Sequence, residues 1–384
     1  MNTIPNGDDQ AMLAESARKY VERGYTAEAR LASLASAHGC SAKRWQEFAD
    51  MGWLALPLRE EDGGLGGSMS DICVLAEELG RALIVEPWIP SGVMAANLLS
   101  STGNAGQRAQ WMPALAAGDK RIAFAAWEHG SRFDATQIKM RADYRDGNYW
   151  LTGTKELALG APGADALIVA AICSHGHEPP EGALFLIEPG TAGLELQNYT
   201  LVDGRHAAHL RLNNAAVGAD ARLDAATDVT QAIQLAVDHA VLVSCAETVG
   251  AMARALEITL DDLKTRKQFG RIVASNQALQ HRLVDMHVAI EETRALVHAA
   301  ARSFTGTGLT RQIYVAATKA YASQAARLVW EESVQMHGAI GMTDEYVLGH
   351  YVRHLAASHI LFGDAEQQLD RLADAEAQIH ATAV

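Results

Sequence analysis

The chain has 384 residues, of which 49% are hydrophobic and 20% are charged, and its formal net charge at neutral pH is −14. This composition is typical of a globular protein with a large apolar core, and the length allows two or three domains. The excess of negative charge excludes a general binder of nucleic acid or of anionic membranes, because such proteins attract phosphates with a basic surface.

The cysteines and the N-terminus indicate the compartment. The four cysteines are scattered without a Cys-x-x-Cys spacing, so the pattern predicts neither a disulfide framework nor a zinc site. The first residues are polar and acidic, unlike a signal peptide, and no apolar run approaches the roughly 18 residues of a membrane span. We therefore expect a cytoplasmic protein without a membrane span.

Residues 1–119 have a helical pattern. Apolar residues recur at three-to-four spacing in Ala11–Tyr20 and Ala42–Met51. A glycine-rich loop at Glu61–Gly67 precedes a helix that runs to Gly80. Further helices are expected over Gly92–Leu99 and Gly106–Ala117.

Residues 120–224 have the pattern of short β-strands. Gln137–Tyr144 and Asn148–Thr154 flank Arg145-Asp-Gly147, and an Asp-Gly pair between two such runs is a hairpin signal. Further strands are expected over Ala166–Ala171, Ala183–Ile187 and Leu194–Leu196, with turns at Pro179-Pro180 and Pro189-Gly190.

Residues 225–384 return to helices, which are longer than the first ones. Apolar positions continue from Asp228 to Lys264, a rod of roughly 55 Å at 1.5 Å per residue. Ser275–Phe304 and Leu309–Met336 are two more long, alanine-rich helices, and three in succession predict a bundle. The sequence therefore predicts an α+β fold that is mainly α, with an N-terminal helical domain (1–119), a β domain (120–224) and a C-terminal helical bundle (225–384).

Two segments of the bundle have the residue types of a nucleotide grip. Arg266–Gly270 combines a guanidinium, an aromatic ring and a glycine at a helix end, so it can hold a phosphate where the backbone comes close. Gln335–Gly341 offers a side-chain amide followed by small residues. A basic residue and a glycine also form an ordinary helix end, so neither segment alone is sufficient evidence. It is the order of the two segments and their context that support the hypothesis of nucleotide binding. No Gly-x-Gly-x-x-Gly pattern follows a strand, which excludes a Rossmann-type site.

With this order of parts, the chain resembles the acyl-CoA dehydrogenase family over nearly its whole length. The motifs that carry the resemblance are Met51-Gly-Trp53, Glu61–Gly67, Glu77–Gly80, Leu151–Lys155, Arg266–Gly270 with Gln277, and Gln335–Gly341. The resemblance implies a barrel- or sandwich-like middle domain and a C-terminal four-helix bundle. It also implies FAD as cofactor, an acyl-CoA substrate, and an electron-transfer flavoprotein or similar acceptor. The assembly is expected to be a homo-oligomer, or a hetero-oligomer with a homologous subunit.

The resemblance divides the FAD contacts between subunits. The residues that it assigns to the grip on a neighbour's adenosine pyrophosphate are Arg266, Phe269, Gln277, Gln335 and Gly338. Trp127–Asp134 aligns with the flavin-facing loop of the family, so Trp127 and Ser131 are expected at the flavin. The Trp-Ile-Thr segment that covers the flavin in the family reads Leu157-Ala-Leu159 here.

The catalytic base departs from the family pattern. The family reaction removes the α-proton of the acyl thioester with a carboxylate while the β-hydrogen leaves as hydride to the flavin. The usual Glu of a Tyr-Glu-Gly-Thr turn aligns without gaps with Phe362, and a shift of the alignment within this turn brings Asp364 into the role. Asp364 also precedes an expected helix over Ala365–Ile379, with Gln367 three residues on. A helix N-cap is therefore the competing interpretation.

Other polar residues have two interpretations. A second subgroup of the family has its base where this chain has Ala240, and Glu247 lies two turns further on as either a base or a paired carboxylate. Asp238 aligns with a position that contacts coenzyme A in relatives, and it also suits the dipole at a helix start. His350 and His354 have a metal-compatible spacing without a third ligand, so we expect solvated histidines and no metal.

The leading hypothesis is FAD-dependent α,β-dehydrogenation of an acyl-CoA thioester. The alternative is a flavin-poor or half-catalytic partner subunit of a hetero-oligomer, because expected flavin contacts are lost while Arg266 and Gln335 are kept. A third hypothesis keeps FAD and changes the reaction, as relatives without the usual Glu do.

Overall fold

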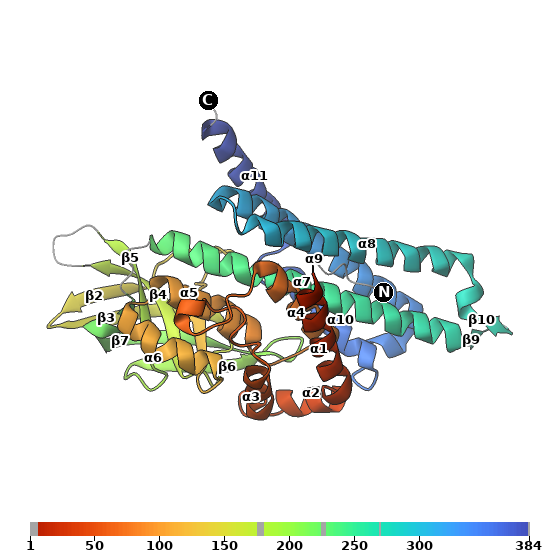
Figure 1. The fold of residues 1–384 in the computed structure, drawn as a ribbon, viewed down its shortest axis with the longest axis horizontal. Coiled ribbons are helices and arrows are strands. Elements are labelled where there is room, and N and C mark those ends of the chain that lie inside the picture. The colour runs from red at the N-terminus through yellow and green to blue at the C-terminus, as the bar shows by residue number, and fades with distance from the viewer. Residues whose placement is uncertain (1–6, 175–179, 224–227, 269, 383–384) are drawn as a thin grey trace. The chain divides into compact units, whose positions relative to one another are not determined.

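The computed structural model describes residues 7–174, 180–223, 228–268 and 270–382 of the chain (Figure 1). Helices come first, strands follow between Ile122 and Leu223, and helices return from Val229. The predicted succession of helical, β and helical parts is confirmed. By their contacts the residues form two compact units. The helical unit consists of Met1–Leu31, Met69–Ile84 and Val241–Val384, and the sheet unit consists of Ala32–Ser68 and Val85–Ala240.

The helical unit is a bundle of long helices. Its helices are α1 (Asp8–Gly24), α4 (Met69–Arg81), α7 (Val229–Thr265) from Val241 onward, α8 (Gln277–Ser303), α9 (Gly308–His337), α10 (Val347–Ile360) and α11 (Ala365–Thr382). Helix α9 packs against α8, α10 and α11, so it is the central member of the bundle. A hairpin of β9 (Lys267–Gln268) and β10 (Arg271–Ile272) follows α7, and the short helix η5 (Gly338–Met342) follows α9.

Helices α4 and α7 contact each other backbone to backbone. A Cβ atom added at Gly80 would lie 2.0 Å from the carbonyl oxygen of Glu247, and one at Gly250 would lie 1.9 Å from the carbonyl oxygen of Glu77. No side chain fits at either distance, so both glycines are required by the close approach. The crossing fixes α4 against the bundle.

The sheet unit combines one mixed sheet with short helices. Its helices include α3 (Ala42–Asp50), the π-helix η2 (Trp88–Ala95), α5 (Ala96–Thr102), α6 (Ala105–Ala116) and α7 as far as Ala240, with the single-turn 3₁₀ helices η1 (Glu60–Asp62) and η3 (Ala219–Ala221). Its strands are β1 (Ile122–Ala125), β2 (Arg141–Arg145), β3 (Asn148–Leu159), β4 (Ala166–Ser174), β5 (Glu181–Ile187), β6 (Leu194–Thr200), β7 (His206–Gly218) and β8 (Arg222–Leu223). The strand order is β6-β7-β3-β2-β4-β5-β8, with β1 beside β4. Strands β1 and β2 run parallel to β4, and the other neighbours are antiparallel.

The predicted hairpin is confirmed. Arg145 pairs with Asn148, and Asp146 and Gly147 between them have φ angles of 53° and 79°. Two left-handed residues in a row match the twist of the flanking strands, which explains why Asp-Gly occurs here. Strands β1, β7 and β8 of this sheet were not predicted. The predicted turn at Pro179 lies outside the described residues.

Apolar residues from the whole sheet share one core. Leu210 of β7 and Phe185 of β5 belong to the same buried cluster as Leu151 of β3 and Val169 of β4. Strands β7 and β5 are far apart in the strand order, so the sheet curls around its own apolar face.

Two further features bear on the expected compartment. Helix α7 is, among the described residues, the one helix long and apolar enough to cross a membrane, but 89% of its most apolar window is buried inside the protein. That is the pattern of a core helix. All four cysteines lie within the described residues, and each is a buried, free thiol.

Candidate active site

The turn between α10 and α11 carries the predicted base. The chain reverses over Leu361–Asp364, where Phe362 has a φ of 62° and Gly363 a φ of 108°. Asp364 is half-buried, and its Oδ1 atom accepts a hydrogen bond of 2.9 Å from the backbone N–H of Gln367. Asp364 is therefore the N-cap of α11, as the Asp and the Gln three residues later predict. The cap uses one carboxylate oxygen, so it is compatible with a role as base.

Phe362, which aligns with the family base, points into the interior. Its side chain is 3% exposed, and its carbonyl oxygen accepts a 3.0 Å hydrogen bond from the side-chain amide of Gln368. An apolar side chain cannot take a proton, so within this turn Asp364 is the residue with the required chemistry.

Glu247 forms a buried pair. Its side chain is in the interior, with Oε2 at 3.7 Å from Nε2 of His354 on α10. This arrangement favours the paired-carboxylate interpretation of Glu247. The prediction of solvated histidines is wrong, because His350 is 8% exposed and His354 is 2% exposed. Within the described part of the chain, no group of three His, Cys, Asp or Glu side chains is arranged to hold a metal ion.

The two motifs of the predicted nucleotide grip meet at the end of the bundle. Nη1 of Arg266 donates a 3.2 Å hydrogen bond to the carbonyl oxygen of His337, the last residue of α9. Gln335 and Gly338 flank that residue and are exposed. Gln277 is the first residue of α8 and is also exposed. Phe269 lies outside the described residues.

These exposed groups fit a nucleotide pyrophosphate. A guanidinium and a carboxamide offer N–H donors, which a phosphate needs on a chain of net negative charge. A Cβ atom added at Gly270 or Gly338 would meet nothing within 4 Å, so both glycines border open space. Gly338 has a φ of 73°, a left-handed conformation that glycine adopts readily.

The predicted flavin-facing loop of the sheet unit is held by its own contacts. Trp127 is 4% exposed and donates its indole N–H to the carbonyl oxygen of Phe133 at 3.0 Å. Ser131 is 2% exposed. Glu128 accepts a 2.6 Å hydrogen bond from the ammonium group of Lys155. It also accepts hydrogen bonds from the backbone N–H groups of Lys139 and Met140. Trp127 therefore has a structural contact of its own, and a flavin contact stays a prediction for both Trp127 and Ser131.

Asp238 lies in the sheet unit on α7. It is fully buried and accepts a 3.0 Å hydrogen bond from the side-chain amide of Gln234. It stands in the third turn of α7, beyond the reach of the dipole at the helix start. The dipole interpretation is wrong, and the coenzyme A contact stays a prediction.

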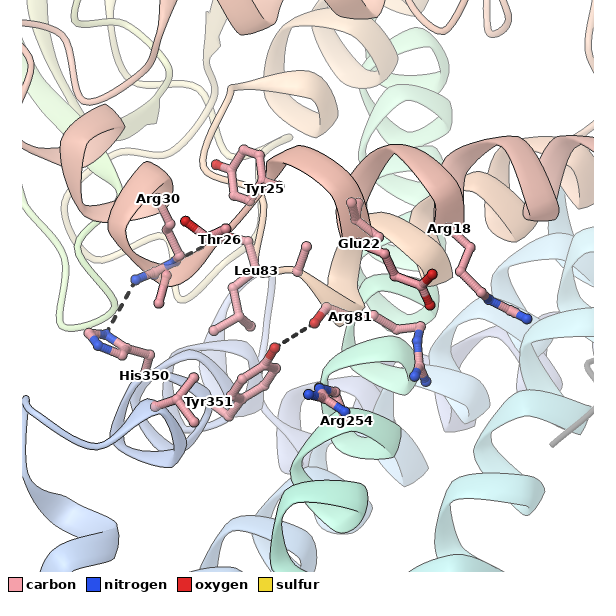
Figure 2. Close-up of a pocket in the computed structure, with 14 residues that line it drawn as sticks. Arg18, Glu22, Tyr25, Thr26, Arg30, Arg81, Leu83, Arg254, His350 and Tyr351 are labelled. Atoms are coloured by element: carbon pink, nitrogen blue, oxygen red, sulfur yellow. Dashed lines mark hydrogen bonds between the residues drawn. The ribbon is translucent and has the colours of Figure 1, made fainter. Parts of the chain in front are cut away.

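A basic cavity of about 310 Å³ lies within the helical unit (Figure 2). Its walls come from α1, the start of α2 (Ala27–Leu34), the end of α4, α7 and α10. Figure 2 shows Arg18, Arg81 and Arg254 on one side and Arg30 beside His350 on the other. None of the predicted site residues lines this cavity, so it is separate from the Leu361–Asp364 turn and the nucleotide grip.

Carboxylates behind the wall neutralise the cavity arginines. Glu257 accepts two 2.8 Å hydrogen bonds from Arg81 and one of 2.9 Å from Arg254. Glu78 accepts a hydrogen bond from the guanidinium group of Arg18. These ion pairs link α1, α4 and α7. The arginines therefore have a structural role, because they form a junction that holds the three helices together. No periodic pattern in the sequence predicts this junction, because its members come from distant helices.

Comparisons with known proteins agree with this architecture. Two models of one family match the chain, "Acyl-CoA dehydrogenase, N-terminal domain" over residues 7–119 and "Acyl-CoA dehydrogenase, C-terminal domain" over residues 230–377. The chain is 28% identical to "Acyl-CoA dehydrogenase IpdE2" of Mycolicibacterium smegmatis over 370 residues. These matched residues cover 95% of this chain and 98% of that protein.

Solved structures are similar over the whole length. A variant of the Tcur3481-Tcur3483 steroid ACAD has 28% sequence identity and a TM-score of 0.86, covering 98% of this chain and 99% of that one. A chain of the ChsE4-ChsE5 complex from Mycobacterium tuberculosis has 25% identity and a TM-score of 0.87 over the same shares.

Proposed function

Since the chain belongs to the acyl-CoA dehydrogenase family and is an FAD-dependent oxidoreductase, we propose that it catalyses the α,β-dehydrogenation of an acyl-CoA thioester with Asp364 as the base. The observation that carries the proposal is the Leu361–Asp364 turn. It presents a half-buried carboxylate whose Oδ1 is fixed by the backbone N–H of Gln367. The other oxygen is left to accept a proton.

The geometry suits the abstraction of a weakly acidic proton. An α-carbon next to a thioester is a poor acid, so its base must be held in one orientation and partly removed from water. The cap fixes the first oxygen of Asp364, and the left-handed pair Phe362 and Gly363 fixes the approach of the backbone. FAD, when bound, supplies the hydride acceptor. Arg266, Gln277, Gln335 and Gly338 would hold the pyrophosphate end of that cofactor for a neighbouring subunit, and electrons would leave to an electron-transfer flavoprotein or similar acceptor.

The test is the substitution Asp364→Asn. An amide keeps the cap, because Asn and Asp are about equally good N-caps, but it cannot take a proton. We expect turnover to fall by about 10²–10⁴-fold while the flavin content and the unfolding temperature stay near those of the wild type. The assay is anaerobic flavin bleaching with butyryl-CoA, isovaleryl-CoA and a steroid side-chain CoA thioester. Asp370→Asn, at an exposed position of α11, is the matched control. Unchanged turnover in Asp364→Asn would show that the residue only caps its helix.

A second candidate is a half-catalytic subunit of a hetero-oligomer. Specific residues favour it: Phe362 and Ala240 stand at the two positions where family bases align, and Trp127 and Ser131 are buried in their own loop. In addition, the two similar structures, Tcur3481-Tcur3483 and the ChsE4-ChsE5 complex, are each named for two components. Under this proposal flavin and turnover appear only when the chain is co-expressed with a homologous subunit. Full activity of the purified chain alone would contradict it.

A further inference from the structure

Lys319 is a buried lysine that the proposed reaction does not use. It lies on α9 with 2% of its surface exposed, and its ammonium group donates a hydrogen bond to the carbonyl oxygen of Ser358. Lysines are almost never fully buried without a partner, because removing the charge from water is costly. The position of the acceptor therefore indicates what the lysine does.

Ser358 lies in the last turn of α10. The final carbonyl groups of a helix have no intrahelical donor and carry partial negative charge, so a cation placed there is stabilised and satisfies one of them. The backbone leaves α10 two residues later and turns through Phe362 and Gly363 to Asp364. Lys319 thus holds the backbone at the start of the Leu361–Asp364 turn.

Two ionisable side chains lie near Lys319. Burial lowers the pKa of Lys319, and the nearby Cys245 and Asp364 oppose that change. Asp364 is thus close to Lys319 and also follows, in the chain, the backbone that Lys319 holds.

A second buried side chain holds the same turn from the other side. The amide of Gln368, which is 1% exposed on α11, donates to the carbonyl oxygen of Phe362. The turn is therefore held by two interior donors, a cation from α9 and a neutral amide from α11. This pair permits a comparison between a charged and an uncharged support.

We propose that Lys319 is a positioning residue for Asp364, because its buried side chain fixes the end of α10 from which the Leu361–Asp364 turn begins. The inference rests on the proposed function of Asp364. It assigns to α9 a part in catalysis without contact to the substrate.

The experiment compares Lys319→Met with Gln368→Met and with Lys319→Arg in the holoenzyme. Hydrogen exchange of peptides over Leu361–Gln368 is measured without substrate, and kcat and KM are measured with the most active of the three acyl-CoA probes. We expect both Met variants to exchange several-fold faster in this segment. Both should also lower kcat several-fold with little change in KM, because a base that is out of position slows the chemical step more than it weakens substrate binding. Lys319→Arg should restore most of kcat, because a guanidinium can donate to the same carbonyl oxygen.

Unchanged kcat in a folded Lys319→Met protein would overturn the inference, as would unchanged exchange. If Lys319→Met does not fold, Lys319→Gln is measured in the same way. Absence of turnover in the wild type would contradict the proposed function instead, and the exchange comparison would still decide whether Lys319 holds the turn.

Discussion

Glu257 pairs with two of the arginines that line the basic cavity. Burial raises its pKa, but the hydrogen bonds from Arg81 and Arg254 outweigh burial, so the pKa is lowered from 4.5. The folded chain then binds fewer protons at this group than the unfolded chain does near pH 4.5. The contribution of Glu257 to stability is therefore present above pH 4.5 and is lost as the pH falls through the lowered value.

We predict that Glu257→Gln destabilises the protein at neutral pH but not in acid. The side chain is 42% exposed and screened by water, so the loss should not exceed about 1 kcal/mol. The difference from the wild type should shrink as the pH falls below 4.5. Urea unfolding followed by circular dichroism measures it. The exposed Glu345→Gln on the same unit is the control and should show little difference at either pH.

Local sequence predicted some residue roles and failed at others for a physical reason. The cap at Asp364 was predictable, because an N-cap depends on residues only a few positions apart. The burial of His350 and His354 was not, because their contacts include Arg30 of α2 and Glu247 of α7, which come from distant parts of the sequence. The burial of Lys319 was not predictable either, since a lysine on a long helix is typical of a solvated face.

At the level of elements, the crossing of α4 and α7 depends on two glycines. Glu77, Gly80, Glu247 and Gly250 face each other there, and the backbone atoms leave no room for a methyl group. Nearby, Glu77 accepts 2.9–3.0 Å hydrogen bonds from Arg294 of α8. The crossing and this ion pair together fix α4 on the bundle.

We predict that Gly250→Ala destabilises the helical unit strongly. The added Cβ would meet the carbonyl oxygen of Glu77 at 1.9 Å, so α4 must move away, at a cost of about 1–3 kcal/mol or more. Gly308→Ala at the start of α9 is the matched control. Its added Cβ meets only the end of the Arg311 side chain at 3.8 Å, and alanine favours a helix. Thermal unfolding that is equally altered in both variants would contradict the role of the crossing.

Strands were less predictable than helices. The helices of the bundle have many apolar repeats, so their periodicity is clear over a long stretch. Strand β1 is buried at all four positions and has no alternation. In β7 the alternation of leucines with polar residues is confined to His209–Asn213, because the adjacent pairs Ala207-Ala208 and Asn213-Asn214 break it. Strand β1 also depends on β4, and β7 on β3, which are distant in sequence.

At the scale of the whole molecule, the acidic chain must bind a cofactor that is itself anionic. The net charge of −14 repels a pyrophosphate, so local donors have to overcome it. The resemblance predicted both donor motifs, and their contact through Arg266 and His337 agrees with a common role. Which chain binds which part of the cofactor was not predictable from one sequence, because the answer depends on the assembly.

We predict that Arg266→Gln purifies with less FAD. The fork of the guanidinium can hold two phosphate oxygens, and a neutral amide loses both the charge and the fork. The ratio of flavin absorbance to protein absorbance after gel filtration measures the effect. Arg271→Gln on the same hairpin removes the same charge from an exposed position and should retain the wild-type ratio. Equal flavin loss in both variants would indicate a general effect of charge rather than a grip by Arg266.

The burial of the four cysteine thiols has a practical consequence. Cys40, Cys73, Cys173 and Cys245 are at most 8% exposed, and burial raises the pKa of each. A thiolate is the species that reacts with oxidants and alkylating reagents, so the native protein should tolerate air and storage without a reducing agent. The same groups become reactive when the chain opens, and the rate at which a thiol reagent labels them therefore reports unfolding without an introduced probe.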